Sequence, residues 1–598
     1  MPRVLQALDE NAERWVMLIC YTFCCIVIVH EVVRRFDFNF SSAWGEEAAR
    51  YAFIYLGWIG AAYAVRERAH IRFDIVLGRV GPRTKAGFMI FAELATIVFA
   101  SIALYWSLHT IRQLLQFEGA TPVLRINKAW FEAAVPIGFA LILWPSMQGI
   151  ARDWRDLRAG RGLRRQSHVR GMSGMNPVVL SVLGLIGLLV VGVPFWVAMG
   201  LGTVAMLSLT QALPLTLVGE ALFEGVDSFA LIAIPLFVLT GDAMVRTGLG
   251  EKLLNFAEAS FGSLRSGFGT STVMGCGLFA CISGSDAADA AAVGRLTMDR
   301  LVAKGYPKPY ACALVASGAC TGILIPPSIA YIIIGLVLGV SSATLFLAAF
   351  VPGVIVQLSV MVTNAVINRI HGHEKSTGRF DFGRWLRALW AARFALAIPL
   401  VILGGIYSGV FTPTESAAVA VTVAVATGLA QGRLALADFP AMLGTSARVC
   451  GVVLPIIAVA LLFSQALTVL DVPQTFVARV MGFGSDRNSI VILLLLIWIV
   501  AGMFMETGPN IVVLGPLLWP LAQAVGMQQV HFCVFMITTL GLGFITPPFG
   551  LNLFVMSGLT RVPVASIAAR ALPFAAVMVA VSALIGFVPQ ISMFMISK

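Results

Sequence analysis

The sequence has few charged residues, and this scarcity decides its class. Only 12% of the 598 residues are Asp, Glu, Lys or Arg, whereas 59% are hydrophobic, and the mean hydropathy is +0.89. Soluble domains carry about 25% charged residues, so a soluble fold is excluded. Long apolar runs without the period-two alternation of barrel strands recur along the chain. We therefore expect an all-α polytopic membrane protein in a lipid bilayer.

Several chemical signatures are also missing. The nine cysteines include no CxxC pair and have no histidine cluster beside them, which favours small buried side chains over a metal site or disulfides. Neither a nucleotide-binding fingerprint nor a P-loop occurs, so we expect no ATP and no organic cofactor, and an ion gradient as the energy source. The net charge of +11 lies in short loops, which indicates membrane orientation rather than nucleic acid binding.

Four apolar segments occupy the amino-terminal quarter, at 15–33, 48–65, 88–108 and 131–150. No small-residue cleavage site precedes them, so the first segment is expected to remain as a span. Seven arginines between 152 and 170, without an apolar face, predict a basic cytoplasmic linker. We thus predict a four-helix module at 1–151, a linker at 152–172 and a larger module at 173–598.

The larger module contains an internal duplication. Ser283-Gly284 matches Thr507-Gly508, and two Pro-Pro pairs and two single prolines also match, all at offsets of 219 to 224 residues. Opposite loop charges indicate that the two copies are inverted, because the loop after the first copy's tip is basic whereas residues 488–560 contain no Lys or Arg. The predicted repeats are about 176–392 and 393–598.

One difficulty concerns the start of the first repeat. Inverted repeats place residue 176 on the outer side, yet the arginine-rich linker before it is predicted to be cytoplasmic. Either the segment 176–212 does not cross as two full spans, or one orientation in the first module is wrong.

A stretch of small and acidic residues, Cys281 to Gly294, interrupts the apolar region of the first repeat. Asp286 and Asp289 should face protein or water, because charge in hydrocarbon is costly. The small residues predict an exposed, unwound backbone whose oxygens could coordinate a small cation. Both aspartates also suit a helix start, and the sequence leaves the two roles open.

Paired prolines mark a second kind of break. Pro326-Pro327 and Pro547-Pro548 cannot lie in a continuous helix, because each proline removes a donor and clashes with the preceding turn. Breaks at matching repeat positions indicate a transport site, although they could also be kinks in scaffold helices. Glu415 is typical of a helix start and is expected to be structural.

An enzyme is less consistent with these residues. Ser283-Gly-Ser-Asp286 suggests an intramembrane protease, but no histidine lies in the apolar centres nearby to act as a base. We therefore expect no enzymatic activity. A gated ion channel is a further alternative from a different class.

Eight motifs carry a family resemblance. They are Glu47-Ala-Ala-Arg-Tyr51, Ala64-Val-Arg-Glu-Arg-Ala-His-Ile-Arg72, Ile282-Ser-Gly-Ser285, Ala288-Asp-Ala-Ala291, Gly322-Ile-Leu-Ile-Pro-Pro-Ser328, Phe411-Thr-Pro-Thr-Glu415, Gly502-Met-Phe-Met505 and Thr546-Pro-Pro-Phe-Gly-Leu-Asn-Leu553. They resemble the tripartite ATP-independent periplasmic (TRAP) transporters. The first module is similar to the small membrane subunit and the larger module to the large one, so nearly the whole chain resembles a fusion of the two. Asp286 departs from the family pattern, which has a small or hydroxylated residue there.

The resemblance implies an elevator-type transporter with two re-entrant hairpins and two broken helices, moving against a scaffold. It also implies two or more coupling sodium ions. One site would use Ser283, Gly284, Gly322 and Ile325, and the other Thr507, Gly508, Gly543 and Thr546. For substrate binding or coupling we assign Ser285, Asp286, Asp289, Pro326, Pro327, Asn510, Pro547 and Pro548.

The function we predict is a sodium-driven symporter in the bacterial inner membrane. It imports a small organic anion that a periplasmic substrate-binding protein delivers, and a one-component dicarboxylate carrier of similar design is the nearest alternative. C4-dicarboxylates, sialic and other sugar acids and keto acids all suit the site. The fused small module favours a monomer.

Overall fold

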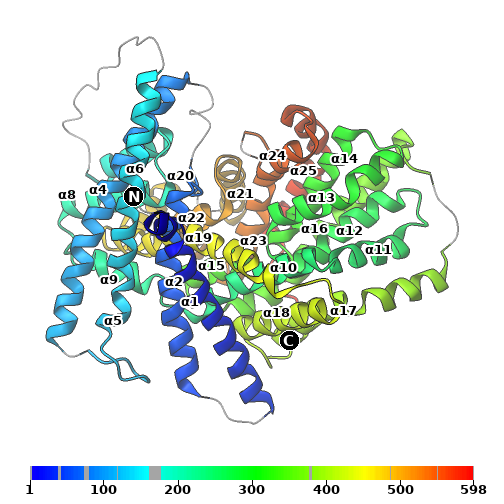
Figure 1. The fold of residues 1–598 in the computed structure, drawn as a ribbon. Coiled ribbons are helices and arrows are strands. Elements are labelled where there is room, and N and C mark those ends of the chain that lie inside the picture. Colours follow the sequence, from blue (N-terminus) through cyan, green and yellow to red (C-terminus); the bar gives the residue numbers. More distant parts are fainter. Residues whose placement is uncertain are drawn as a thin grey trace. The chain divides into compact units, whose positions relative to one another are not determined.

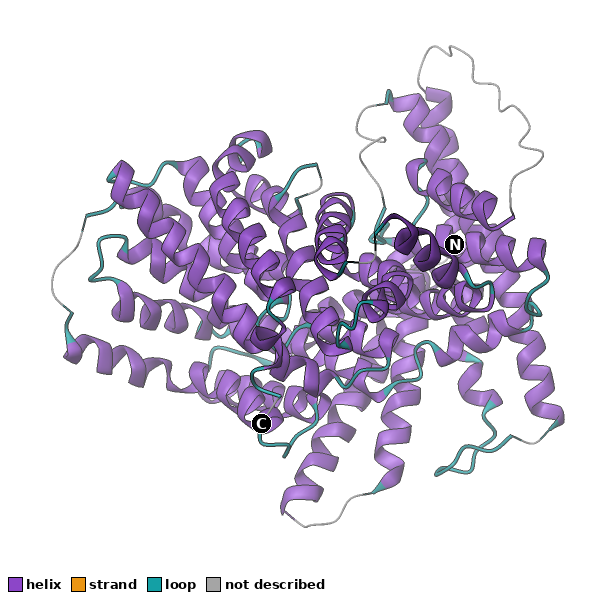
Figure 2. Ribbon diagram, turned by 180° about the vertical axis from the view of Figure 1, so that it is seen from behind, coloured by secondary structure: helices purple, strands orange, loops and turns teal. Residues whose placement is uncertain are grey.

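The computed structural model describes residues 3–37, 42–72, 80–117, 119–159, 177–375, 380–484, 486–548 and 550–596. Over these residues the chain is helical and forms no strand, with one isolated bridge between Ala120 and Asn127 (Figure 2). Ten helices in the described part are long and apolar enough to cross a membrane. The predicted all-α polytopic membrane fold is confirmed.

The chain forms two compact units, which we describe separately. Unit 1 contains residues 1–232 and 443–472, and unit 2 contains residues 233–442 and 473–598. In unit 1 the four predicted apolar segments form helices: α1 (Arg3–Asp37), α2 (Ala43–Arg66), α4 (Pro82–Gln116), and α5 (Ala129–Glu132) with α6 (Ala134–Ala159) (Figure 1). Each helix extends beyond the segment that hydropathy predicted.

Helix α6 continues into the predicted linker. It ends at Ala159 rather than near 151, because Asp153 lies on its buried face and accepts two 2.9 Å hydrogen bonds from the Arg68 guanidinium. The linker residues 160–172 lie outside the described residues.

Unit 1 also includes the start of the larger module: α7 (Pro177–Val190), α8 (Phe195–Thr210), α9 (Leu217–Glu224) and the short 3-10 helix η1 (Phe229–Ile232). The helices α7 and α8 contain 14 and 16 residues. A straight span needs about 20. These lengths favour the first alternative above, that 176–212 does not cross as two full spans.

Close packing joins these helices to the first module. The ring centroids of Trp196 on α8 and Phe99 on α4 are 5.7 Å apart. On α19 (Phe439–Val469), a Cβ at Gly451 would lie 2.1 Å from the carbonyl oxygen of Gly60 on α2, so only glycine permits this contact. Helices of the larger module therefore share one core with the first module.

Unit 2 begins with α10 (Ala233–Arg246), α11 (Leu249–Phe261), α12 (Gly267–Ser283), α13 (Asp286–Ala303), α14 (Lys308–Ala319), η2 (Cys320–Ile323), α15 (Ile329–Leu338) and α16 (Ser342–His371). Then follow α17 (Phe382–Tyr407), α18 (Pro413–Ala430), η3 (Leu436–Asp438), α20 (Val472–Phe483), α21 (Arg487–Phe504), α22 (Thr507–Ala524), α23 (Gln529–Leu540), η4 (Gly541–Ile545), α24 (Leu551–Thr560), α25 (Val564–Phe587) and α26 (Pro589–Met593).

The element order shows the duplication. The series α10 to α16 is repeated as α19 to α25, and each series contains two helices joined at a tight tip, followed by a helix broken at Pro-Pro. Glu415 has the structural role predicted for it, because it forms a reciprocal capping box with Thr412 at the start of α18.

Candidate functional site

The first hairpin tip is only two residues long. Helix α12 ends at Ser283, Gly284 has a left-handed φ of 59°, and Ser285 is the N-cap of α13. The predicted exposed, unwound backbone across the whole small-residue stretch is therefore wrong. Glycine provides the sharp reversal within one residue, so both flanking helices keep their hydrogen bonds up to the tip.

Two buried carboxylates lie on the first turns of α13. Asp289 is fully buried, and its Oδ1 accepts a 2.5 Å hydrogen bond from the hydroxyl of Ser283. Its Oδ2, and Oδ2 of the 4% exposed Asp286, are buried without a hydrogen-bond partner. A buried carboxylate oxygen without a donor is costly, so each of these two atoms is suited to take up a proton or a cation. Asp286 also begins the helix, where negative charge is favoured.

The first broken helix packs directly against this tip. It consists of α14, η2, an irregular segment with the cis Pro326-Pro327 bond, and α15. A Cβ at Gly322 would lie 2.7 Å from Oδ2 of Asp289 and 2.8 Å from the backbone nitrogen of Asp286. A Cβ at Gly284 would lie 2.9 Å from the carbonyl oxygen of Pro327. The structure thus brings together the tip, both aspartates and the break.

The second tip differs from the first. Helix α21 ends at Phe504, and Glu506 is the N-cap of α22, so Thr507 and Gly508 begin a helix whereas Ser283 ends one. The Nδ2 of Asn510 donates to the carbonyl oxygens of Ala501 (3.3 Å) and Met505 (3.1 Å) and so caps the end of α21. Ser283 and Thr507, which the repeat spacing aligned, therefore do not occupy equivalent positions at the two tips.

The second break lies against the second hairpin. A Cβ at Gly543 would lie 2.0 Å from the carbonyl oxygen of Gly502, so η4 and α21 touch through their backbones. The hydroxyl of Thr507 is buried without a partner, whereas the hydroxyl of Thr546 donates to the carbonyl of Leu542 at 2.9 Å. The Cβ position of Gly508 faces open space.

Contacts between the two breaks join these halves. The side chain of Asn552, on α24, donates a 3.1 Å hydrogen bond to the carbonyl of Ala316, on α14. The η2 and η4 segments touch, with Ile323 3.4 Å from the Cβ position of Gly541. Asp286 and Glu506 are also close enough to interact electrostatically. Each tip thus lies against its own break, and the two breaks contact each other.

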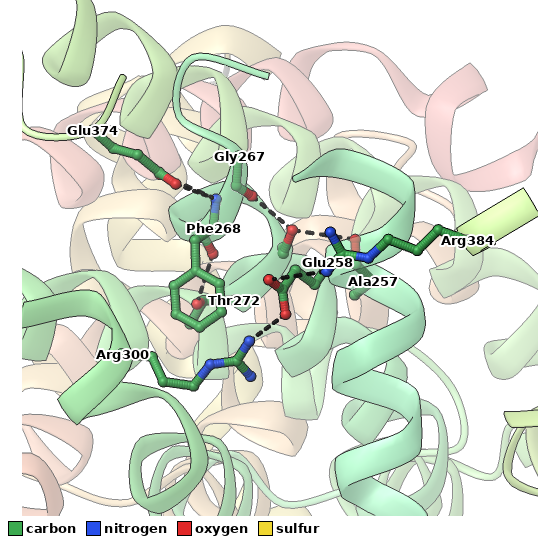
Figure 3. A network of polar contacts seen from close by, with 9 residues as sticks. Ala257, Glu258, Gly267, Phe268, Thr272, Arg300, Glu374 and Arg384 are labelled. Carbon is green, nitrogen blue, oxygen red and sulfur yellow. Dashed lines mark hydrogen bonds and ion pairs between the residues drawn. The ribbon is translucent and has the colours of Figure 1, made fainter. Parts of the chain in front are cut away.

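Two residues that sequence reasoning passed over hold the first hairpin in place. Glu374 is buried and accepts hydrogen bonds from the backbone of Phe268 at 3.0 Å and the hydroxyl of Tyr306 at 3.0 Å, which caps the start of α12. Glu258, on α11, lies between Arg300 on α13 and Arg384 on α17 and pairs with both (Figure 3). Only the fold brings these distant residues together, and no local motif marks them.

Comparison with known proteins identifies the class. The family model of the DctM component of the tripartite ATP-independent periplasmic transporters matches residues 182–591, and the model of the DctQ component matches residues 23–156. The chain belongs to this family, and it joins both components in one polypeptide. It is therefore a membrane transport protein and not an enzyme.

Three relatives illustrate the range of names in the family. The isethionate TRAP transporter permease protein DctMQ of Oleidesulfovibrio alaskensis is 30% identical, over 99% of this chain and 96% of the relative. The C4-dicarboxylate TRAP transporter large permease protein DctM of Pseudomonas aeruginosa is 34% identical, over 62% and 87%. The sialic acid TRAP transporter permease protein SiaT of Haemophilus influenzae is 25% identical, over 98% of both chains.

Proposed function

We propose that this permease is a sodium-coupled symporter that imports a small organic acid from a periplasmic substrate-binding protein. It works in the inner membrane of a bacterium. The three relatives above are named for isethionate, C4-dicarboxylates and sialic acid, which supports an organic anion as the substrate class. This chain matches a fused permease over nearly the full length of both proteins, which supports a permease that works with a separate substrate-binding protein here as well.

Unpartnered oxygens at the two tips support sodium coupling most directly. Oδ2 of Asp289 and the hydroxyl of Thr507 are buried without a donor or acceptor, each on a hairpin whose partner break lies against it. Hard cations bind oxygen ligands, and transporters supply these at broken helices. The first ion would bind at Ser283, Gly284, Gly322 and Ile325, with Asp289 beside them. The second would bind at Thr507, Gly508, Gly543 and Thr546.

The helices that begin at the tips and breaks suit an anionic substrate. The amino-terminal ends of α13, α15, α22 and α24 all begin at a tip or a break, where backbone N–H groups and the helix dipole favour negative charge. We assign substrate binding or coupling to Ser285, Asp286, Asp289, Pro326, Pro327, Asn510, Pro547 and Pro548. The bound sodium ions would offset the acidic side chains, so that the anion binds only after the cations.

Movement of the substrate would follow an elevator mechanism. Both hairpins and both broken helices belong to unit 2, and the hydrogen bond from Asn552 to Ala316 ties the two breaks together. Helices α2 and α19 pack backbone against backbone in unit 1, which suits a rigid scaffold. The tips and breaks would slide as one body and carry substrate and sodium across.

The test is uptake into proteoliposomes that contain the purified full-length permease. A panel of labelled organic acids is offered with candidate binding proteins, with and without an inward sodium gradient. We expect uptake only when the matching binding protein and sodium are both present. Uptake without a binding protein would favour a one-component carrier, and uptake that is indifferent to sodium would contradict the two cation sites.

A further inference from the structure

A cavity of about 290 Å³ lies at the ends of α13 and α24 that are distant from the tip and the break. The helices α13, α14 and α24 pack on one another (Figure 1), and residues at their ends contribute to the lining of the cavity. Its lining is contributed by Gly294, Arg295, Met298, Asp299, Val302, Lys308, Leu559, Thr560 and Arg561. None of these residues belongs to the site described above.

The charge of this lining is unbalanced. It contains three basic side chains, Arg295, Lys308 and Arg561, and one acidic side chain, Asp299. None of the four forms an ion pair with another described residue, whereas the neighbouring Arg300 is paired with Glu258. Cations that converge on a cavity without protein partners create a positive potential there, which attracts anions.

Backbone groups at the cavity add to this potential. Lys308 is the first residue of α14, and its N–H has no partner within that helix, whereas the next residue, Pro309, has no N–H. The last carbonyl groups of α24 have the opposite effect, but one of them is already occupied. The N–H of Arg561 donates to the carbonyl oxygen of Ser557 at 2.7 Å.

The cavity is connected to the candidate transport site through two helices. From Asp286 at the tip to Arg295 the chain rises about 14 Å along α13, at 1.5 Å per residue. Gly294 lets α24 approach, because its Cβ position lies 3.0 Å from Met556 Sδ. The sequence predicts that this end faces the cytoplasm, since the loop after α13 is basic.

We propose that this cavity is an anion-binding site that takes an oxyanion group, a carboxylate, sulfonate or phosphate, between Arg295, Lys308 and Arg561. Guanidinium groups bind such groups through paired, charge-assisted hydrogen bonds. The ligand is either a free organic anion on the cytoplasmic side or the headgroup of an anionic lipid. Both present the same oxygens to the same three cations.

The test measures binding on the purified full-length protein without any transport. In detergent, thermal unfolding is followed with sodium sulfate and with sodium chloride at equal sodium concentration, and choline chloride is added to the second buffer to equalise the ionic strength. In nanodiscs, the same measurement compares phosphatidylglycerol with phosphatidylcholine. The double variant R295Q/R561Q removes two of the cations, and R295K/R561K keeps the charge. R369Q is a control that removes one exposed basic residue at the end of α16.

We expect sulfate or phosphatidylglycerol to raise the melting temperature of the wild type and of R369Q. R295Q/R561Q should weaken binding of that ligand by about tenfold or more, and the lysine pair should restore part of it. A response to sulfate identifies a free anion, and a response to phosphatidylglycerol alone identifies a lipid headgroup. An equal response in the wild type and in R295Q/R561Q, or none with either ligand, would overturn the proposal, and neither result depends on sodium-coupled uptake.

Discussion

The replacement of Gly322 by alanine is the sharpest test of how the first tip and its break fit together. The new methyl group would lie 2.7 Å from Oδ2 of Asp289 and 2.8 Å from the backbone nitrogen and Cα of Asp286. Ordinary van der Waals contact begins near 3.4 Å, so η2 and α13 must separate by about 0.6 Å. The methyl group would also occupy the space beside the unpartnered oxygen, where we place the cation.

The cost of this change follows from close packing. An extra methyl group in a tightly packed interior costs about 1–3 kcal/mol. If that strain falls on the cation-bound state, the sodium concentration for half-maximal uptake rises roughly 5- to 150-fold, at about 1.4 kcal/mol per factor of ten. Uptake of the substrate by proteoliposomes, with saturating binding protein and a series of sodium concentrations, measures this shift directly.

Gly558 provides the matched control. It lies on α24, and nothing lies within 4 Å of its Cβ position. G558A should therefore keep the sodium dependence of the wild type and gain up to about 1 kcal/mol of helix stability. If G322A shows unchanged sodium dependence and an unchanged melting temperature, the break does not pack on α13 as described, and the first cation site must be abandoned.

Three further changes test other parts of the structure. T507V removes a buried hydroxyl while keeping the shape of the side chain. If the hydroxyl binds the cation, sodium-dependent uptake should fall. A stabilisation of about 1–2 kcal/mol with normal uptake would instead show that the hydroxyl is merely buried. E374Q weakens the cap of α12 and should lower the stability by about 2 kcal/mol in thermal unfolding. Adding Q357E to this variant should not restore the stability, because the side chain of residue 357 contacts a different turn of α12. Burial lowers the pKa of His70 from 6.5 to about 4. The imidazole of His70 takes up a proton below pH 6.5 in the unfolded chain but only below about pH 4 in the folded chain, so the folded state loses stability as the pH falls between these values. H70Q should remove this pH dependence, which amounts to about 2 kcal/mol at pH 5 when unfolding is measured as a function of pH.

Much of the fold could be predicted from local signals. Apolar runs predicted the helices, and Pro326-Pro327 and Pro547-Pro548 predicted the breaks, because a proline acts on its own turn of helix wherever it lies. Helix ends were less certain. Whether α6 stops near 151 depends on the ion pair of Asp153 with Arg68, which joins residues far apart in sequence.

The candidate site shows the same limit. Repeat spacing found every segment that meets at the tips and breaks, but it aligned Thr507 with Ser283, although one begins a helix and the other ends one. The supporting residues Glu258 and Glu374 gave no signal, because their partners lie on other helices. Periodicity and motif spacing report on a single element, whereas these contacts exist only after folding.

The duplicated architecture does not imply duplicated chemistry. The first hairpin buries two carboxylates on α13, and one of them is already bound by the hydroxyl of Ser283. The second hairpin uses the amide of Asn510 to cap α21 and leaves the hydroxyl of Thr507 without a partner. A carboxylate attracts a cation far more strongly than a hydroxyl does. The two proposed sodium sites should therefore differ in affinity, with the first filled at lower sodium concentration. Loss of Asp289 should then affect uptake more than loss of Thr507.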